Sequence, residues 1–188
     1  NVKNMVGVWR DGRDVLISLY YHSLFDNELS NSYGVKKCRS DLKFDNYEDI
    51  RANLPKFIDY VFYQKKISKM TWSDFVNKWA YRKDVAHVRY ESLLKNPNKT
   101  LKGIIAKLSD ISLSDKDIEL IIQEHSFQNK SGRLSGCENK NSFLRKGISG
   151  DWKNHFNKES REKFNALSGK ELIILGYEEN EDWGNDPR

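Results

Sequence analysis

Residues 2–25, VKNMVGVWRDGRDVLISLYYHSLF, decide the fold class. They open with a short valine-rich run that is typical of a buried strand. A turn is expected at Asp11-Gly12, after which Asp14 is placed to cap a helix that reaches about Phe25. A second run of the same kind, DVAHVRY, occupies residues 84–90. Short apolar strands that are buried on both faces are typical of α/β folds, in which helices flank a parallel sheet.

The rest of the chain is predicted to form helices and loops. Apolar spacing and capping residues predict helices at residues 47–64, 71–79, 97–108, 114–124 and 157–175, the last interrupted near Gly169 and ended by Gly176. Residues 26–45 and 132–141 are polar and are predicted to be loops. A parallel sheet commonly has about four to six strands. Two strands are too few, so we expect the sheet to be incomplete in this chain and further strands to lie outside it.

Composition narrows the class of protein. The chain has 188 residues, of which 38% are hydrophobic, and this suffices for one domain with a core. No apolar run approaches the roughly 20 residues that span a bilayer. Cys38 and Cys137 lack metal-ligand spacing, so we expect no metal site and favour free thiols in a cytoplasmic protein over a disulfide. The net charge of +5 favours an anionic ligand, but interspersed acids argue against nucleic acid.

The first candidate site lies where the first predicted strand ends. Arg10 leaves the carboxyl end of the strand, and Ser18 lies in the following helix. Ligands bind at this end of strands in open α/β sheets, and a guanidinium with a hydroxyl can hold a phosphate. The alternative is a surface pair of Arg10 with Asp14 and an inert Ser18, which is the commoner outcome for such a pattern taken alone.

The second candidate is RKGISGDWKNHF at residues 145–156. Arg145 and Lys146 precede Gly147, a second glycine follows three residues later, and Asp-Trp opens a short helix. Glycines let backbone amides approach an anion, so the stretch favours a phosphate-binding loop. It lacks the GKS or GKT ending of a nucleotide-binding P-loop. The alternative is a basic surface loop with Trp152 in the core.

The third candidate is aromatic. Tyr90 ends the second predicted strand, and Phe127 follows a predicted helix. An aromatic ring in such a position can stack on a nucleotide base. Core packing is the commoner role for either residue taken alone.

Together these segments resemble the cytosolic-type sulfotransferases. That family has a strand followed by Arg-x-x-Arg/Lys-Asp-x-x-x-Ser, which matches residues 10–18, and a strand ending in Tyr-Glu-Asp/Ser before a helix that starts with Pro, which matches residues 90–97. It also has Ser-Phe after a helix, here Ser126-Phe127, and Arg-Lys-Gly-x-x-Gly-Asp-Trp-Lys-Asn-x-Phe, which matches residues 145–156 without a break. Order and spacing agree over most of the chain, most loosely at residues 26–69.

The resemblance implies a P-loop-NTPase-like sulfotransferase fold and transfer of a sulfuryl group from 3′-phosphoadenosine 5′-phosphosulfate (PAPS) to a hydroxyl or amine of a small molecule. The product nucleotide would be adenosine 3′,5′-bisphosphate (PAP), and no metal is implied. The 3′-phosphate contacts of the family map onto Arg10, Ser18, Arg145, Lys146 and Gly147, and its adenine contacts map onto Tyr90, His125, Ser126 and Phe127.

The same resemblance implies that the main catalytic groups are not in this sequence. The family's 5′-phosphosulfate loop, its catalytic histidine and its lysines precede the strand that ends at Arg10, so we expect them upstream of Asn1, and residues 1–188 as the C-terminal portion of one sulfotransferase domain. We therefore expect this chain alone to be inactive. The alternatives are a non-catalytic module that binds PAP and, on charge alone, a nucleic-acid-binding domain.

The acceptor site and the oligomeric state are less well defined by the sequence. Tyr21, His22 and Phe25 are candidates to line the acceptor site under a lid formed by residues 26–45, although Phe25 also suits the core. The family's dimer motif, Lys-x-x-x-Thr-Val-x-x-x-Glu, maps onto residues 153–162, where Asn157-Lys158 replace Thr-Val. Homodimerisation therefore stays an open alternative.

Overall fold

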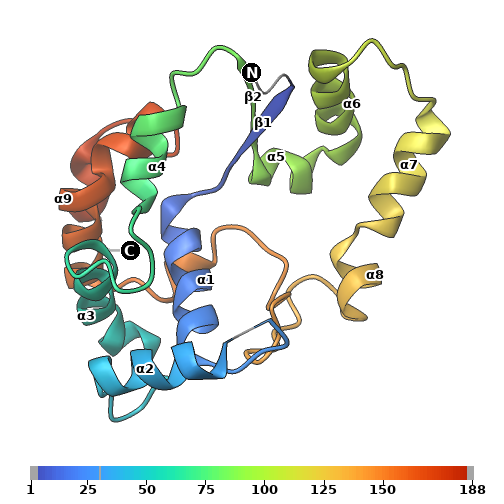
Figure 1. The fold of residues 1–188 in the computed structure, drawn as a ribbon. Coiled ribbons are helices and arrows are strands. Elements are labelled where there is room, and N and C mark those ends of the chain that lie inside the picture. The colour runs from blue at the N-terminus through green and yellow to red at the C-terminus, as the bar shows by residue number, and fades with distance from the viewer. Residues whose placement is uncertain (1–3, 30, 186–188) are drawn as a thin grey trace.

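The computed structural model describes residues 4–29 and 31–185. It is an α/β structure in which helices flank a small parallel sheet (Figure 1). None of the helices in these two ranges is long and apolar enough to cross a membrane. The elements are, in chain order, β1 Met5–Trp9, α1 Gly12–Leu24, α2 Ser32–Leu42, α3 Ile50–Phe62, α4 Trp72–Trp79, β2 Val85–Arg89, α5 Tyr90–Lys95, α6 Pro97–Leu108, α7 Asp115–Glu124, α8 Phe127–Ser131, the 3-10 helix η1 Asp151–Asn154, α9 Lys158–Ile174 and the 3-10 helix η2 Glu181–Asn185.

The sheet pairs β1 with β2 in parallel, from Met5 opposite Val85 to Trp9 opposite Arg89. The predicted fold class is confirmed, and both strands occur where the sequence predicts them, except that Val2 and Lys3 lie outside the described residues. The prediction that both faces of the strands are buried is wrong for β1. Val6 and Val8 are exposed, because no described element packs over them.

Helices α1–α4, η1 and α9 pack together beside β1, and we call these elements together with β1 the body. Helix α1 presents Leu16, Ile17, Tyr20 and Leu24 to the core, and α3 and α9 pack against each other beside it. Burial of each such side chain contributes about 1.5–3 kcal/mol before the entropic cost. The body therefore gives α1, the helix that leads away from Arg10, a rigid setting.

Three local predictions are wrong. Asp11 caps α1 through the Arg13 amide, at 2.9 Å, because the Asp14 carboxylate faces the loop that precedes η1. Residues 26–45 contain α2, which Asn31 caps and which packs against the core through Leu42. Helix α9 continues through Gly169, where it lies against α4 and η2.

Several helix ends follow the sequence prediction. Thr71 and Ser114 form capping boxes with the aspartates three residues later, Asp74 and Asp117. Asn157 caps α9 by accepting a hydrogen bond from the Ser160 amide at 2.8 Å. Past the end of α9, Gly176 takes a left-handed conformation with φ 66°.

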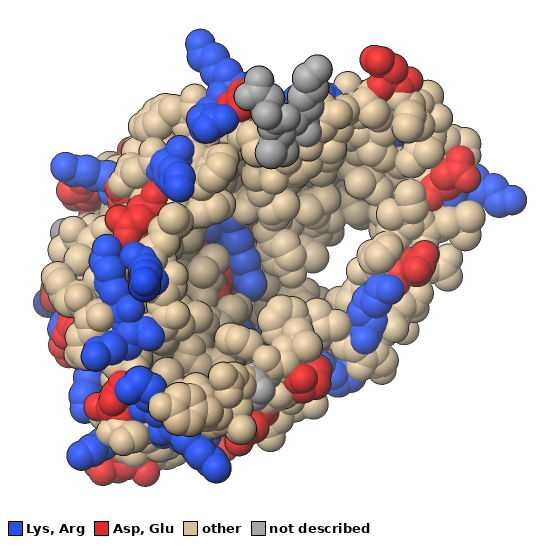
Figure 2. Space-filling model, in the orientation of Figure 1, with Lys and Arg blue, Asp and Glu red and all other residues tan. Residues whose placement is uncertain are grey.

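Helices α5–α8 form an arm that departs from the end of β2 and returns toward α1 (Figure 1). Open space separates much of this arm from the body in Figure 2. Within these four helices, all of them in the described part of the chain, Ile118 is the one buried residue. The arm carries Tyr90 and Phe127 at the first positions of α5 and α8, so it supplies both predicted base-stacking residues.

Candidate nucleotide site

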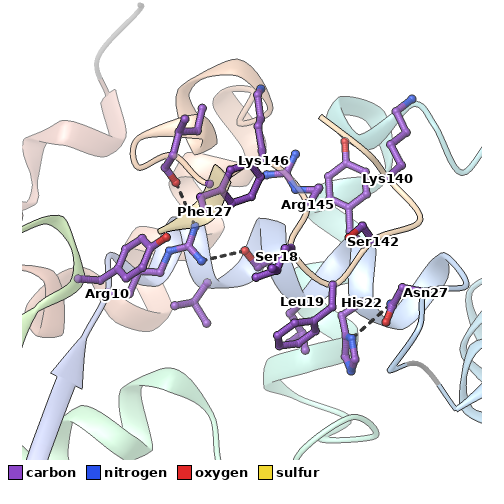
Figure 3. Close-up of a pocket in the computed structure, with 17 residues that line it drawn as sticks. Arg10, Ser18, Leu19, His22, Asn27, Phe127, Lys140, Ser142, Arg145 and Lys146 are labelled. Carbon is purple, nitrogen blue, oxygen red and sulfur yellow. Dashed lines mark hydrogen bonds between the residues drawn. The ribbon is translucent and has the colours of Figure 1, made fainter. Parts of the chain in front are cut away.

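Arg10 extends from the end of β1 into a cavity and is held there by neutral groups. Its Nη1 donates to Ser18 Oγ at 3.1 Å, and its Nη2 donates to the Ile148 carbonyl at 3.4 Å (Figure 3). The Nε atom is buried and has no hydrogen-bond partner in the described part of the chain. No ion pair of Arg10 occurs there either, so the predicted alternative of an Arg10–Asp14 surface pair is wrong. An oriented guanidinium without a carboxylate partner keeps its charge for an anion.

Asp14 fixes the glycine-containing loop to α1. Its two carboxylate oxygens accept hydrogen bonds from the amides of Gly150 at 2.6 Å and Trp152 at 2.9 Å. Burial raises the pKa of the Asp14 carboxyl, while these two amide hydrogen bonds act in the opposite direction. The loop and α1 are 136 residues apart in sequence, and this contact brings the first two candidate segments together.

Asp151 holds the side chains of the two cations that precede Gly147. Its carboxylate is 2.6 Å from both Arg145 Nη2 and Lys146 Nζ, and it also accepts from Asn154 and His155. Burial would raise the pKa of Asp151, but hydrogen bonds from His155, Lys146, Arg145 and Asn154 hold it far below its usual range. The resemblance implied that both cations face a phosphate. The structure places both beside the cavity, already paired with a carboxylate.

The aromatic end of the cavity is formed by the arm. The Arg10 guanidinium lies over the Tyr90 ring, with 4.8 Å from Cζ to the ring centroid. Phe127 packs on Gly147 so closely that a Cβ at this position would lie 2.4 Å from the ring. Gly147 also has φ 67°, so both the backbone and the contact require glycine. An aromatic pair and an oriented arginine therefore share one cavity.

This cavity has a volume of about 390 Å³, within the usual range of about 300–1,000 Å³ for small-molecule sites. Figure 3 shows Arg10 at one end, pointing toward Ser18 near the middle, and His22 and Asn27 at the other end. The unpartnered Arg10 Nε, the glycine against an aromatic ring and the two further cations fit a ligand that has both a planar base and a phosphate. The predicted residues that line it are Arg10, Ser18, Tyr21, His22, Tyr90, Phe127, Arg145, Lys146 and Gly147.

Comparison with known proteins decides the family. Residues 1–176 match the family model described as the sulfotransferase domain. The chain belongs to this family. It is 30% identical to sulfotransferase 2A1 of Macaca fascicularis over 186 residues, 28% identical to sulfotransferase 1B1 of Mus musculus over 185, and 25% identical to amine sulfotransferase of Oryctolagus cuniculus over 187. These matches cover 92–93% of the chain and 55–58% of the relatives, so this sulfotransferase chain spans little more than half their length.

A solved structure shares the fold. The crystal structure of mouse sulfotransferase SULT7A1 complexed with PAP matches with a TM-score of 0.64 and 21% sequence identity. The match covers 91% of this chain and 61% of that chain. Because the sequence identity is low, the structural match shows the fold alone: the small parallel sheet and its flanking helices belong to the sulfotransferase fold.

Two of the predicted adenine contacts lie off the cavity in this sulfotransferase chain. His125 is exposed at the C-terminal end of α7, and it is not among the lining residues. Ser126 caps α8 by accepting from the Asn129 amide at 3.2 Å, so its hydroxyl is used within the arm. Tyr90 and Phe127 are the members of this set that face the cavity.

The predicted acceptor residues also divide. Tyr21 and His22 line the cavity, and the His22 ring makes an edge contact with Phe143. Phe25 is buried in the core cluster and does not line the cavity, so its core alternative holds. Burial raises the pKa of the Tyr21 phenol, as do the charge and hydrogen bond of Glu138. Tyr21 is therefore neutral near pH 7 and is not a base.

Residues 138–144 form a strap along the cavity that the sequence analysis missed. The strap is held by Glu28, whose carboxylate accepts from Ser142 Oγ at 2.9 Å and from the Phe143 amide at 3.0 Å. Lys140 of the strap also forms an ion pair with Glu48, with 2.9 Å from Nζ to Oε2. In the predicted lid, residues 32–42 form α2, and of the described residues 26–29 and 31–45 Asn27 alone lines the cavity. The predicted loop at residues 132–141, rich in serine, glycine and asparagine, overlaps the first part of the strap, so that part resembled a plain linker.

Proposed function

We propose that this chain is the nucleotide-holding portion of a sulfotransferase that uses PAPS and releases PAP. The observation that carries the proposal is Arg10, held by Ser18 and the Ile148 carbonyl, with a buried Nε that has no hydrogen-bond partner among the described residues. It lies in one cavity with Tyr90, Phe127 and Gly147. This combination suits a 3′-phosphate attached to an adenosine.

The residues divide the binding work between them. Arg10 and Ser18 donate to the 3′-phosphate, and the left-handed backbone at Gly147 lets the loop come close to it. Tyr90 and Phe127 would hold the base by stacking. Bound PAPS supplies the sulfuryl group for a hydroxyl or amine acceptor. Tyr21 and His22, which also line the cavity, are the candidates to orient that acceptor.

The four histidines support a general base outside this chain. His22 contacts Asn27 and Phe143, and His125 is exposed off the cavity. His87 accepts from the Trp9 indole at 2.9 Å, and His155 contacts Asp151. We therefore propose that the base, the lysines and the 5′-phosphosulfate loop belong to the part of the relatives' length that this chain does not match. Four points stay predictions. They are that residues 1–188 belong to a single domain, that the chain alone is inactive, that its location is cytoplasmic, and the alternative that it forms a homodimer.

Isothermal titration calorimetry with two nucleotides tests the proposal. PAP should bind at least about tenfold more tightly than adenosine 5′-monophosphate, because it adds a phosphate with charge-assisted hydrogen bonds. Ser18→Ala should weaken PAP binding about two- to thirteenfold, as for loss of one hydrogen bond of about 0.5–1.5 kcal/mol. Ser40→Ala is the matched control, since Ser40 is an exposed residue of α2 that does not line the cavity. Equal affinity for the two nucleotides would contradict the proposal.

A further inference from the structure

Two carboxylates pair with Arg145, and they differ in how firmly they are held. Asp151 contacts Arg145 Nη2 with a side chain that is 1% exposed, and three other groups also donate to it. Glu138 pairs with Nη1 from the strap, and its side chain is 28% exposed. Its other recorded partner among the described residues is the Tyr21 hydroxyl. Asp151 is thus a fixed partner of Arg145, whereas Glu138 has access to solvent.

The backbone around Glu138 is anchored independently of its carboxylate. The Asn139 amide donates to the Arg145 carbonyl at 2.9 Å, and Arg133 Nη1 donates to the Cys137 carbonyl at 2.6 Å. Both neighbours of Glu138 therefore stay in place if its side chain rotates. Release of Arg145 Nη1 requires a change of rotamer and no movement of the strap.

A carboxylate and a phosphate present the same kind of acceptor to a guanidinium edge. Arg145 is 9% exposed and lies over the Tyr21 ring, so the Nη1 edge that Glu138 covers is the edge still open to exchange. Arg145 lines the cavity that contains Arg10 and Ser18.

We propose that Glu138 is an exchangeable counterion: its carboxylate covers Arg145 Nη1 in the free chain and swings into solvent when the nucleotide's 3′-phosphate takes its place, while Asp151 stays bound and positions Arg145. This inference rests on the proposed nucleotide function. It makes Glu138 an affinity-determining residue with an effect opposite in sign to that of Asp151. The free chain must first release its own carboxylate, and this lowers the apparent affinity by the fraction of molecules that are competent to bind.

Glu138→Gln and Asp151→Asn form the matched pair for the test, because each replaces a carboxylate beside Arg145 by an amide of the same size. Both are titrated by calorimetry with PAP and, separately, with inorganic sulfate as a probe of the anion site alone. Glu138→Gln should bind both ligands about three- to tenfold more tightly than the unmodified chain, as expected for removal of a partly exposed competing pair. Asp151→Asn should bind both more weakly, and urea unfolding identifies the conditions in which it is folded. If Asp151→Asn does not fold, the affinities of Glu138→Gln alone test the proposed exchange.

The outcomes separate this inference from the proposed function. If PAP binds the unmodified chain and Glu138→Gln equally, or the variant more weakly, the exchange is wrong and the nucleotide function stands. If neither protein binds PAP but Glu138→Gln binds sulfate more tightly, the nucleotide function falls and with it exchange against a nucleotide, and what stands is competition between Glu138 and an anion at Arg145. If neither binds PAP or sulfate, both are overturned. Glu138→Asp withdraws the carboxylate by one methylene and keeps its charge, so unchanged affinity in this variant, beside tighter binding by Glu138→Gln, would assign the effect to charge alone and overturn the exchange.

Discussion

The body and the arm both contribute side chains to the same cavity and are built with very different packing. The body has a continuous core of aromatic and aliphatic side chains from α1, α3, η1 and α9. The arm has one buried residue in four helices and exposes Leu94, Ile111, Leu120 and Ile121. Ser18 lies on α1 of the body, and Arg10 and the loop at residues 145–147 adjoin it, whereas the arm supplies Tyr90 and Phe127.

This difference separates the two parts of nucleotide recognition. Arg10 and Ser18 adjoin the well-packed core, so we expect them to open mainly with global unfolding, whereas Tyr90 and Phe127 lie on helices with few buried side chains. The buried Arg13 strengthens the contrast, since its guanidinium lies between Trp152 and Trp183 and joins α1 to η1 and the C-terminal segment. We expect the phosphate end to be formed in the free chain and the base end to become ordered on binding.

The largest expected effect is on stability, at Asp14. Asp14→Ala leaves the Gly150 and Trp152 amides without their acceptor in a buried setting, which should lower the free energy of unfolding by about 2–4 kcal/mol. Asp117→Ala in the arm removes a capping carboxylate and should cost about 1 kcal/mol or less. Urea denaturation of both variants measures the difference. Equal losses would remove the distinction between body and arm.

Gly147 joins the two regions and gives the next largest effect. Gly147→Ala should weaken PAP binding more than about tenfold, because its Cβ displaces the Phe127 ring, and stacking of one base contributes about 1–3 kcal/mol. Gly150→Ala is the matched control. Gly150 also has a left-handed backbone, with φ 79°, but a Cβ there meets no atom within 4 Å. Calorimetry should show near-normal affinity for the control. Equal weakening by both would assign the loss to backbone strain.

Much of this site follows from local sequence, and the rest depends on distant contacts. The Arg-Lys-Gly stretch, the strand before Arg10 and both capping boxes are local patterns, so the sequence predicts them. The role of Asp14 does not follow in this way, because its partners are 136 and 138 residues away. Its position after a turn made it look like a helix cap.

Two other differences between the sequence prediction and the structure have separate physical causes. Helix α2 is polar overall and contains Gly34, which concealed Val35 and Leu42 as its buried side, although Asn31 was a readable cap signal. The pairing of Glu138 with Arg145 depends on how the strap bends, and composition gives no information on that path.

Acid pH should weaken the body through Asp151. Its folded-state pKa lies below the unfolded value of about 3.9, so its contribution to stability is complete above that value and is lost as pH falls through and below it. The stability difference between the unmodified chain and Asp151→Asn should therefore shrink by about 1 kcal/mol or more between pH 6 and pH 3. Urea unfolding across this range measures it. A constant difference would mean that the carboxylate is not held in its charged form.

The smallest effect distinguishes two capping boxes of the same design. Thr71→Ala, at the start of α4 in the body, should lower the free energy of global unfolding by about 1 kcal/mol. Ser114→Ala, at the start of α7 in the arm, should raise local hydrogen exchange in α7 with little change in global stability. Hydrogen exchange and urea unfolding of both variants give the comparison. Equal global losses would show that the arm unfolds together with the body.

The most direct test of the proposed nucleotide site is a crystal structure of this chain with adenosine 3′,5′-bisphosphate. We predict the 3′-phosphate within hydrogen-bond distance of Arg10 and Ser18, with the base between Tyr90 and Phe127. A nucleotide bound outside this cavity, or one that presents its 5′-phosphate to Arg10, would contradict this prediction.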